Sequence, residues 1–273
     1  MRSFQDVVVV VSGAASGIGR ASALTFSRLG AKLALADIQE GPLADLAREI
    51  YSNGGSARAF DLDVSDREQV GSFAEAVLCE FGKADVIVNS AGVLILGETR
   101  LVSLEDFRWL MGVNFWGAVH LVHFFLPSMI ERRRGHIVNI SSPNALAPVP
   151  FVGPYAASKA ALDMFSDTLR IEVADFGVGV TTVCPGFTRT EMRAMAKYRA
   201  GTEAREDYLR HVREHVKGRE LDPFEVARRI PSAVLKNRAH VRISAETRLL
   251  SWSYRLVPGL FRRAARYAVK RTP

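Results

Sequence analysis

Seven short apolar runs recur along the chain, each shorter than an ordinary helix. The first, Val7–Val11, is β-branched and shows no alternation of polar and apolar positions, which is typical of a strand covered on both faces. We predict strands at residues 7–11, 32–36, 57–62, 85–88, 135–140, 179–184 and 240–244.

The segments between these runs carry apolar residues at helical spacing. Because strands that alternate with helices imply right-handed crossovers, we expect a parallel sheet of about seven strands. The prediction is one doubly wound α/β domain of the Rossmann type over residues 1–245, followed by a basic helical extension over residues 246–273. The predicted helices cover residues 20–29, 41–51, 67–81, 103–134, 203–216 and 223–235, and a further helix has Tyr155 in its first turns and continues to residue 172.

The 273 residues are 48% hydrophobic and 24% charged, which is the composition of a soluble globular protein. Two cysteines, Cys79 and Cys184, are too few for a disulfide framework and lack metal-ligand spacing, which favours a reducing cytoplasm. The opening residues show no signal-peptide pattern. The apolar run 111–130 contains an asparagine and two histidines, so we expect a buried helix or a subunit contact, not a membrane span.

The net charge of +7 is distributed unevenly. Residues 217–273 contain fourteen Lys or Arg and four Asp or Glu, so this part carries +10 and the remainder −3. Residues 259–270 form an amphipathic pattern with apolar residues on one helical face and four cations on the other. This helix would either lie on an anionic membrane surface or pack on the body or a neighbouring subunit. No nucleic-acid reading module is present, so we expect no nucleic-acid partner.

A glycine-rich segment follows the first strand and precedes the first helix. Gly13, Gly17 and Gly19 would let the backbone turn tightly and approach a pyrophosphate, which then rests on the positive end of the helix. Asp37 ends the second strand, where a carboxylate accepts hydrogen bonds from ribose hydroxyls and repels a 2′-phosphate. Since Ser16 is also neutral and no cation stands beside Asp37, we predict NAD(H) as the cofactor.

Tyr155 and Lys159 lie four residues apart on a predicted helix, so their side chains share one face. A free phenol has a pKa near 10, and a neighbouring ammonium lowers that pKa by favouring the phenolate. Ser142, at the end of a predicted strand, could hold a substrate oxygen against the phenol. This arrangement predicts an acid/base group.

Together these motifs resemble the short-chain dehydrogenase/reductase family over roughly residues 6–244. The segment 89–92 is similar to the family's Asn-Asn-Ala-Gly turn, with Ser90 in place of the second Asn, and Ser142 precedes Tyr155 by the family's thirteen residues. The resemblance implies a catalytic tetrad of Asn114, Ser142, Tyr155 and Lys159. The implied cofactor-binding residues are Gly13, Ser16, Gly17, Ile18, Gly19, Asp37, Asp63, Val64, Asn89, Ala91, Gly92, Tyr155, Lys159, Pro185, Gly186, Thr188 and Thr190.

The resemblance also implies a role for each member of the tetrad. Tyr155 would exchange a proton with the substrate oxygen, which Ser142 also binds, while a hydride moves between the carbinol carbon and nicotinamide. Lys159 would favour the phenolate and hold the nicotinamide ribose, and Asn114 would anchor a water in a proton relay. From the sequence alone, a satisfied core amide or a helix interruption is an equally good interpretation of Asn114.

The expected substrate pocket is lined by residues 93–96, 146–152 and 192–198 and by Phe187, nearly all of them apolar, although Arg189 and Arg193 could reach it. We therefore expect a hydrophobic secondary alcohol or ketone, either steroid-like or lipid-like, and a homodimer or homotetramer. The alternatives are an NADPH-dependent β-ketoacyl-type reductase, which Asp37 disfavours, and a non-catalytic nicotinamide-sensing or membrane-tethered protein.

Two further patterns are assigned no role. His211 and His215 form a His-x-x-Glu-His pattern, but the surrounding segment is saturated with charge, so we expect a solvated helix face and no metal site. Asn139 begins an Asn-x-Ser acceptor pattern but lies in a predicted buried strand, which excludes glycosylation there.

Overall fold

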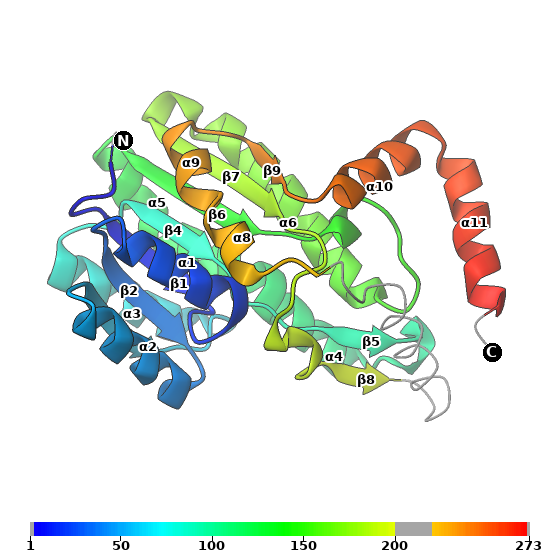
Figure 1. Ribbon diagram of the computed structural model, residues 1–273, viewed down its shortest axis with the longest axis horizontal. Coiled ribbons are helices and arrows are strands. Elements are labelled where there is room, and N and C mark those ends of the chain that lie inside the picture. Colours follow the sequence, from blue (N-terminus) through cyan, green and yellow to red (C-terminus); the bar gives the residue numbers. More distant parts are fainter. Residues whose placement is uncertain (1–2, 200–219, 272–273) are drawn as a thin grey trace.

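The computed structural model describes residues 3–199 and 220–271, which form a parallel sheet covered by helices on both faces (Figure 1). All seven predicted strands are present, each end lying within two residues of its predicted position. The sheet order is β3-β2-β1-β4-β6-β7-β9, so the direction of winding reverses between β1 and β4. Ligands of such sheets bind in the crevice at this reversal, beyond the carboxyl ends of the strands. The strands are β1 Val8–Ser12, β2 Lys32–Asp37, β3 Ser56–Asp61, β4 Val86–Asn89, β6 Gly135–Ile140, β7 Val178–Cys184 and β9 His240–Arg242.

The two faces of the sheet bury separate apolar cores. Val9 and Val11 pack in one core with side chains of α1, α2, α8 and α9, whereas Val10, between them, packs in the other with α3, α5 and α6. Both faces of β1 are therefore buried, which explains why its sequence does not alternate. The helices are α1 Gly17–Ser27, α2 Glu40–Ser52, α3 Arg67–Phe81, α4 Leu104–Met111, α5 Gly117–Glu131, α6 Gly153–Glu172, α8 Pro223–Ala227, α9 Ile230–Leu235, α10 Ala245–Leu256 and α11 Pro258–Arg271.

Two of the predicted helices need correction, and a third cannot be compared with the structure. The helix predicted over 103–134 begins at Leu104 and ends at Glu131, and a π-helical turn, η2 (Gly112–Trp116), separates α4 from α5. The helix predicted over 223–235 is two helices, because Pro231 stands in the first turn of α9 and its ring would clash with a continuous α8. The helix predicted over 203–216 lies outside the described residues.

A second sheet was not predicted from the sequence, whereas the helical extension predicted over residues 246–273 consists, in its described part, of α10 and α11. The second sheet pairs β5 (Ile95–Gly97) with β8 (Lys197–Arg199), strands of three residues each. Its sequence signal is too short for a periodicity to show. Gly97 marks it, however, since a Cβ there would lie 2.0 Å from the carbonyl oxygen of Arg199.

Within the described residues, the continuous helical segment Leu104–Glu131 is long and apolar enough to cross a membrane by length and composition alone. Core helices pass the same test. In this structure Leu121, Phe125 and Met129 are fully buried between α3 and the sheet. The buried part of the segment therefore packs on β4 and β6.

Candidate active site

The glycine loop lies between β1 and α1, at the reversal of the sheet. A Cβ on Gly13, whose φ is +65°, would lie 2.6 Å from the backbone nitrogen of Ala91, and a Cβ on Gly19 would lie 1.9 Å from the carbonyl oxygen of Gly13. The loop can therefore close only with glycine at these positions. Ser16 caps α1 without a side-chain hydrogen bond, and the first turn contains no acidic residue. The exposed amides and positive helix end fit the pyrophosphate of a dinucleotide.

Two distant segments border this loop. Ser12 Oγ accepts hydrogen bonds from the backbone N–H groups of Ser90 and Ala91, at 3.3 and 3.4 Å. Thr190, which follows β7, places its Cγ2 3.0 Å from the position of a Cβ on Gly17. The 89–92 turn and Thr190 therefore border the loop that would hold the pyrophosphate.

The Asp37 carboxylate lies against the same loop. Its Oδ2 accepts a hydrogen bond from the backbone N–H of Ala15 at 2.9 Å, and its Oδ1 accepts one from Gln39 at 3.0 Å. The side chain is buried and held at the end of β2. The carboxylate therefore stands where the adenosine ribose of a dinucleotide bound on the loop would lie.

Asp63 and Val64 have structural duties. Asp63 Oδ1 accepts hydrogen bonds from the backbone N–H and the hydroxyl of Ser65, at 2.8 and 2.7 Å, and so closes the turn before α3. The Val64 side chain is buried in the core and packs where a Cβ on Gly117 would lie. A contact of Val64 with adenine would therefore be made by its backbone and not by its side chain. A contact of Asp63 would be made by the carboxylate that also accepts hydrogen bonds from Ser65.

Tyr155 and Lys159 project from the first two turns of α6. Lys159 is 4% exposed, and its Nζ donates a hydrogen bond to the carbonyl oxygen of Ile140 at 2.9 Å. This Nζ lies 5.9 Å from the centre of the Tyr155 ring and 3.7 Å from the position of a Cβ on Gly92. The pair therefore lies beside the 89–92 turn.

Burial lowers the pKa of Lys159 to about 8. Burial disfavours the charged amine because it removes water from around the ammonium. A pKa of about 8 still leaves most of the side chain protonated at pH 7. Lys159 is thus a cation at neutral pH that loses its charge at moderately alkaline pH.

Asn114 is buried in the π-helical turn, and its side-chain amide joins the segment after β4 to α6 by hydrogen bonds. Its Oδ1 accepts a hydrogen bond from Val93 N–H at 2.7 Å, and its Nδ2 donates to Val93 C=O at 3.0 Å and to Ser158 Oγ at 3.1 Å. Ser158 Oγ in turn donates to the carbonyl oxygen of Tyr155 at 2.8 Å. Both N–H groups of the amide are occupied, so its donors are not available to the relay water that the resemblance implies. The side chain positions α6 relative to Val93, which follows the 89–92 turn.

Ser142 lies at the end of β6 and caps the short helix η3 (Pro143–Ala145), accepting a hydrogen bond from Asn144 N–H at 3.2 Å. Because η3 packs on α6, Ser142 is held on the side of the sheet that carries Tyr155. The adjacent Ser141 is buried beside the carboxylate of Asp163, which follows Tyr155 by two turns of α6. The thirteen-residue spacing selects Ser142, and the place of Ser141 agrees with that selection.

The segments predicted to line the substrate pocket gather around the Tyr155 ring, which is 8% exposed. Asp106 fastens them, since its carboxylate accepts hydrogen bonds from Lys197 at 3.2 Å and Arg199 at 2.6 Å. Phe187, in contrast, is 46% exposed and lies outside this apolar cluster. The cluster contains Val93, Leu94, Ile95, Leu96, Val102, Trp109, Leu110, Val149, Val152, Ala156, Met192, Ala196 and Tyr198.

The loop after β7 contains four of the predicted cofactor-binding residues, which contact different parts of the structure. Gly186, with a φ of +96°, lies against Ser244 at the start of α10, while buried Pro185 precedes it. Thr188 pairs with Leu221, and Thr190 borders the glycine loop. Arg189 forms an ion pair with Asp222 at 3.4 Å. The side chain of Arg193 lies outside the described part of the structure.

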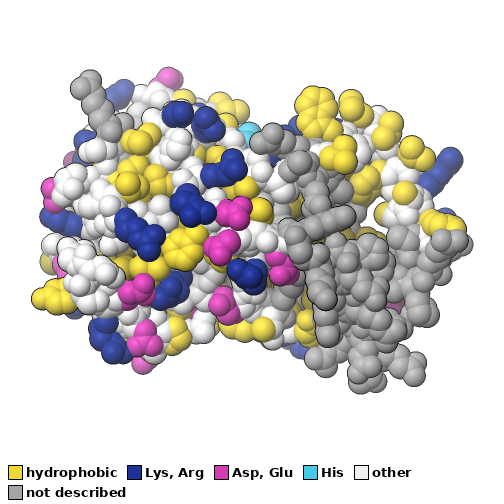
Figure 2. Space-filling model, viewed as in Figure 1, with side chains coloured by type: hydrophobic (Ala, Val, Ile, Leu, Met, Phe, Trp, Pro, Cys, Tyr) yellow, Lys and Arg dark blue, Asp and Glu magenta, His cyan; other side chains and the backbone are white. Residues whose placement is uncertain are grey.

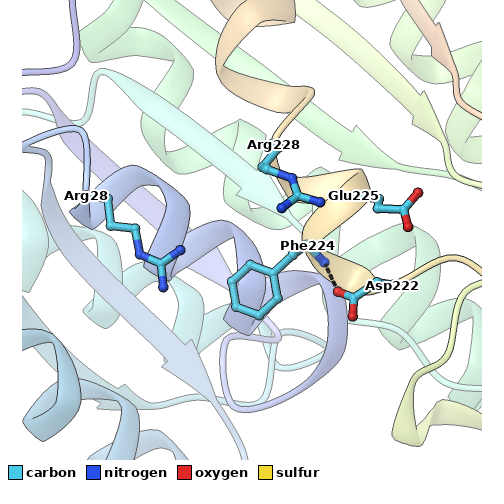
Figure 3. Close-up of a pocket in the computed structure, with 5 residues that line it drawn as sticks. All are labelled: Arg28, Asp222, Phe224, Glu225 and Arg228. Atoms are coloured by element: carbon cyan, nitrogen blue, oxygen red, sulfur yellow. Dashed lines mark hydrogen bonds between the residues drawn. The ribbon is translucent and has the colours of Figure 1, made fainter.

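A separate open depression of about 440 Å³ is lined by Arg28, at the C-terminal end of α1, and by residues 222–228 in and around α8 (Figure 3). The Arg28 guanidinium stands 5.6 Å from the centre of the Phe224 ring, and Asp222 caps α8 through Phe224 N–H. No tetrad residue lines it, so it is distinct from the candidate site. Among the described residues no three His, Cys, Asp or Glu side chains converge as metal ligands, and His211 and His215 lie outside those residues.

Sequence reasoning missed a buried polar ladder beneath the site. Asn89 Nδ2 donates to Asn139 Oδ1 at 2.7 Å, and Asn139 Nδ2 donates to Ser166 Oγ at 2.7 Å. The ladder fixes β4, β6 and α6 relative to one another. An amide in an otherwise apolar strand is the signal that could have revealed Asn139, because a buried amide needs partners.

Comparison with known proteins gives the same grouping. A family model described as short chain dehydrogenase matches residues 7–200. The probable oxidoreductase EphD of Mycobacterium tuberculosis is 41% identical over 270 residues, which are 97% of this chain and 46% of that protein. The chain thus spans about half the length of the first curated relatives that it matches.

Two solved structures are also similar. A short chain dehydrogenase/reductase from Burkholderia phymatum in complex with NAD is 32% identical, with a TM-score of 0.84 over 94% of this chain and 96% of that one. A metagenomic short-chain oxidoreductase in complex with NADP is 27% identical, with a TM-score of 0.73 over 88% of this chain and 98% of that one. With its glycine loop and its tyrosine–lysine pair inside the matched residues, the chain belongs to the short-chain dehydrogenase/reductase family of oxidoreductases.

Proposed function

We propose that the protein interconverts a hydrophobic secondary alcohol and its ketone with NAD(H). The observation that carries this proposal is the buried Tyr155–Lys159 pair beside the 89–92 turn, where an acid/base group meets the glycine loop. When bound there, the dinucleotide supplies the acceptor or the donor of the hydride.

The chain's own residues handle the proton and the orientation of the substrate. In the direction of oxidation, the Tyr155 phenolate accepts the proton of the substrate hydroxyl, and Ser142 holds the same oxygen by a hydrogen bond. The Lys159 ammonium stabilises the phenolate. In the direction of reduction, Tyr155 returns its proton to the oxygen of the former carbonyl. Asn114 and Ser158 keep the first turn of α6, and hence Tyr155, in register with the 89–92 turn.

The choice of NAD(H) over NADP(H) rests on Asp37. One similar structure contains NAD and another contains NADP, so the likeness alone does not select the cofactor. A carboxylate at the ribose position repels a 2′-phosphate, and the Ala15 N–H fixes this carboxylate in place.

Asp37→Asn is expected to reduce the preference for NADH over NADPH by about tenfold or more. The amide oxygen can still accept the hydrogen bond from Ala15, so the loop stays closed while the negative charge is removed; a tenfold change corresponds to about 1.4 kcal/mol. The measurement is kcat/KM with each cofactor. Asp61→Asn is the matched control, because Asp61 is exposed at the same register position of β3. An unchanged cofactor preference in Asp37→Asn would refute the role given to this carboxylate.

The apolar surroundings of Tyr155 support a hydrophobic substrate. The experiment is a panel of ketones and alcohols followed by NADH absorbance, in which bulky apolar ketones should be reduced with a higher kcat/KM than small 2-oxo acids. A preference for the acids would exclude this substrate class. Activity on β-ketoacyl thioesters with NADPH alone would favour the reductase alternative, and NADH binding without turnover of any compound would favour a non-catalytic role.

A second copy of the chain is the expected partner. Trp116 is 50% exposed, Met164 69% and Ile171 79%, and the Phe115–Phe165 ring contact places η2 beside α6. We propose that this outer face is covered in a homodimer or homotetramer, since large exposed apolar patches mark interfaces. Light scattering should give a multiple of the 30.0 kDa chain mass, and Ile171→Asp should give the monomer. A monomeric wild-type protein would contradict this proposal.

We also propose a cytoplasmic location. Cys79 is exposed and unpaired, and Cys184 is buried and unpaired, as suits a reducing compartment. Fractionation of cells that express the chain with an epitope tag should recover it in the cytoplasmic fraction. Recovery from an oxidising compartment would exclude this location.

A further inference from the structure

The chain ends in two helices that leave the body of the molecule (Figure 1). α10 is anchored at its beginning, where Ser244 caps it through Thr247 N–H at 3.1 Å and the Thr247 side chain is buried. This first turn contacts β9 and η3. The remainder of α10 and all of α11 extend past this anchor.

The two helices pack on each other at a defined elbow. Pro258 begins α11, and the rings of Tyr254 and Phe261 make an edge-to-face contact at 5.4 Å. Arg262 Nη2 also donates a hydrogen bond to the Tyr254 hydroxyl at 3.2 Å. The elbow therefore has its own internal contacts, and the α10–α11 unit presents a fixed surface.

That surface is apolar along one line. Leu249, Trp252 and Leu256 recur at helical spacing on one face of α10 and are 72%, 61% and 69% exposed. Leu260, at the start of α11, is 66% exposed and continues the line. Figure 2 shows hydrophobic side chains gathered at the end of the molecule where Figure 1 places these helices. The sequence left open whether such a face packs on the body, and for these four side chains it does not.

The positive charge of the α10–α11 unit favours a negatively charged partner. Arg255, Arg262, Arg263 and Arg266 are exposed, and residues 258–271 contain five cations and no acidic residue. A symmetric contact between two copies of this face would bring like charges together, which disfavours self-association. Exposed tryptophan and leucine beside arginine, in contrast, match the headgroup boundary of an anionic bilayer, where apolar side chains insert and cations meet phosphate.

We propose that α10–α11 is a docking surface for an anionic phospholipid membrane, on which the protein lies peripherally. Because the first turn of α10 contacts η3, which Ser142 caps, docking brings the bilayer to the substrate side of the sheet. The docking surface is independent of turnover, since none of its exposed residues belongs to the tetrad or to the glycine loop.

The test is co-sedimentation of the full chain with vesicles of phosphatidylcholine alone and of phosphatidylcholine mixed with phosphatidylserine. Binding is expected on the mixed vesicles, tighter by about tenfold or more than on phosphatidylcholine, and weaker as salt is added. Each cation near the surface strengthens binding about fivefold, so the double variant Arg263→Glu/Arg266→Glu should lose at least about 25-fold. Trp252→Ser/Leu256→Ser should lose at least about tenfold.

The matched control is Arg48→Glu/Tyr51→Ser on α2, which changes one exposed cation and one exposed aromatic residue on the body and should bind as the wild type does. All variants should keep the wild-type melting temperature, because the replaced side chains are exposed. The proposal is overturned by equal binding to both vesicle types, by losses in the α2 variant as large as those in the tail variants, or by binding of an oligonucleotide without binding of vesicles. A fall in molar mass of Trp252→Ser/Leu256→Ser, without vesicle binding by the wild type, would overturn it in favour of a second copy.

Discussion

Tyr155→Phe is expected to lower kcat/KM by about 10³-fold while changing the dissociation constant of NADH by less than about threefold. The hydroxyl is the only group removed, and a positioned general acid/base contributes roughly 10²–10⁴-fold. The phenylalanine ring retains the packing of Tyr155 against Leu96 and Val152, so the fold and the glycine loop should be preserved. Steady-state kinetics and NADH fluorescence titration measure the two quantities.

The control for this experiment is Tyr51→Phe, which removes a phenol from the exposed face of α2 and should leave both quantities unchanged. Matching thermal unfolding of the two variants would exclude a folding defect. Turnover of Tyr155→Phe at the wild-type rate would remove the proposed acid/base group from the mechanism.

Gly19→Ala is expected to weaken NADH binding by at least about 10²-fold. A Cβ at this position would lie 1.9 Å from the carbonyl oxygen of Gly13, and that oxygen belongs to backbone, which cannot rotate away. The loop must open to relieve the clash, and the amides that would meet the pyrophosphate then move. Calorimetric titration of NADH measures the affinity, and unfolding of the apoprotein reports any separate loss of stability.

Gly41→Ala is the matched control. A Cβ on Gly41, near the start of α2, would meet no atom within 4 Å. Alanine is favoured over glycine in a helix by about 1 kcal/mol at most, so this variant should be as stable as the wild type or slightly more stable and should bind NADH equally. NADH affinity of Gly19→Ala equal to that of Gly41→Ala would show that the loop does not hold the dinucleotide.

The sheet and the glycine loop could be predicted because their signals are local. A strand buried on both faces needs a run such as Val7–Val11, and a loop that closes on its own backbone needs glycine at fixed positions, as at Gly13 and Gly19. Tyr155 and Lys159 are likewise set by the helical period. These features do not depend on which distant segment packs against them.

The remainder depends on tertiary partners. Asn114 joins Val93 to Ser158 because both happen to lie within reach, at separations of 21 and 44 residues. No periodicity in the sequence connects these positions. The pairing of β5 with β8 is of the same kind, since it joins segments about a hundred residues apart. The break before α9 differs, because Pro231 was visible and a stricter use of the proline rule would have found it.

If the charge of Lys159 favours the ionised form of Tyr155, removal of that charge must change the pH dependence of alcohol oxidation. Single-turnover rates at saturating NAD⁺ would be measured for the wild type and for Lys159→Met. Because the pKa of Lys159 is about 8, the ammonium is present at neutral pH, and the wild-type rate should rise at a lower pH than the rate of Lys159→Met. In Lys159→Met the rising limb should move toward the value of a free phenol, near pH 10. Coincident rising limbs in the two proteins would contradict the account.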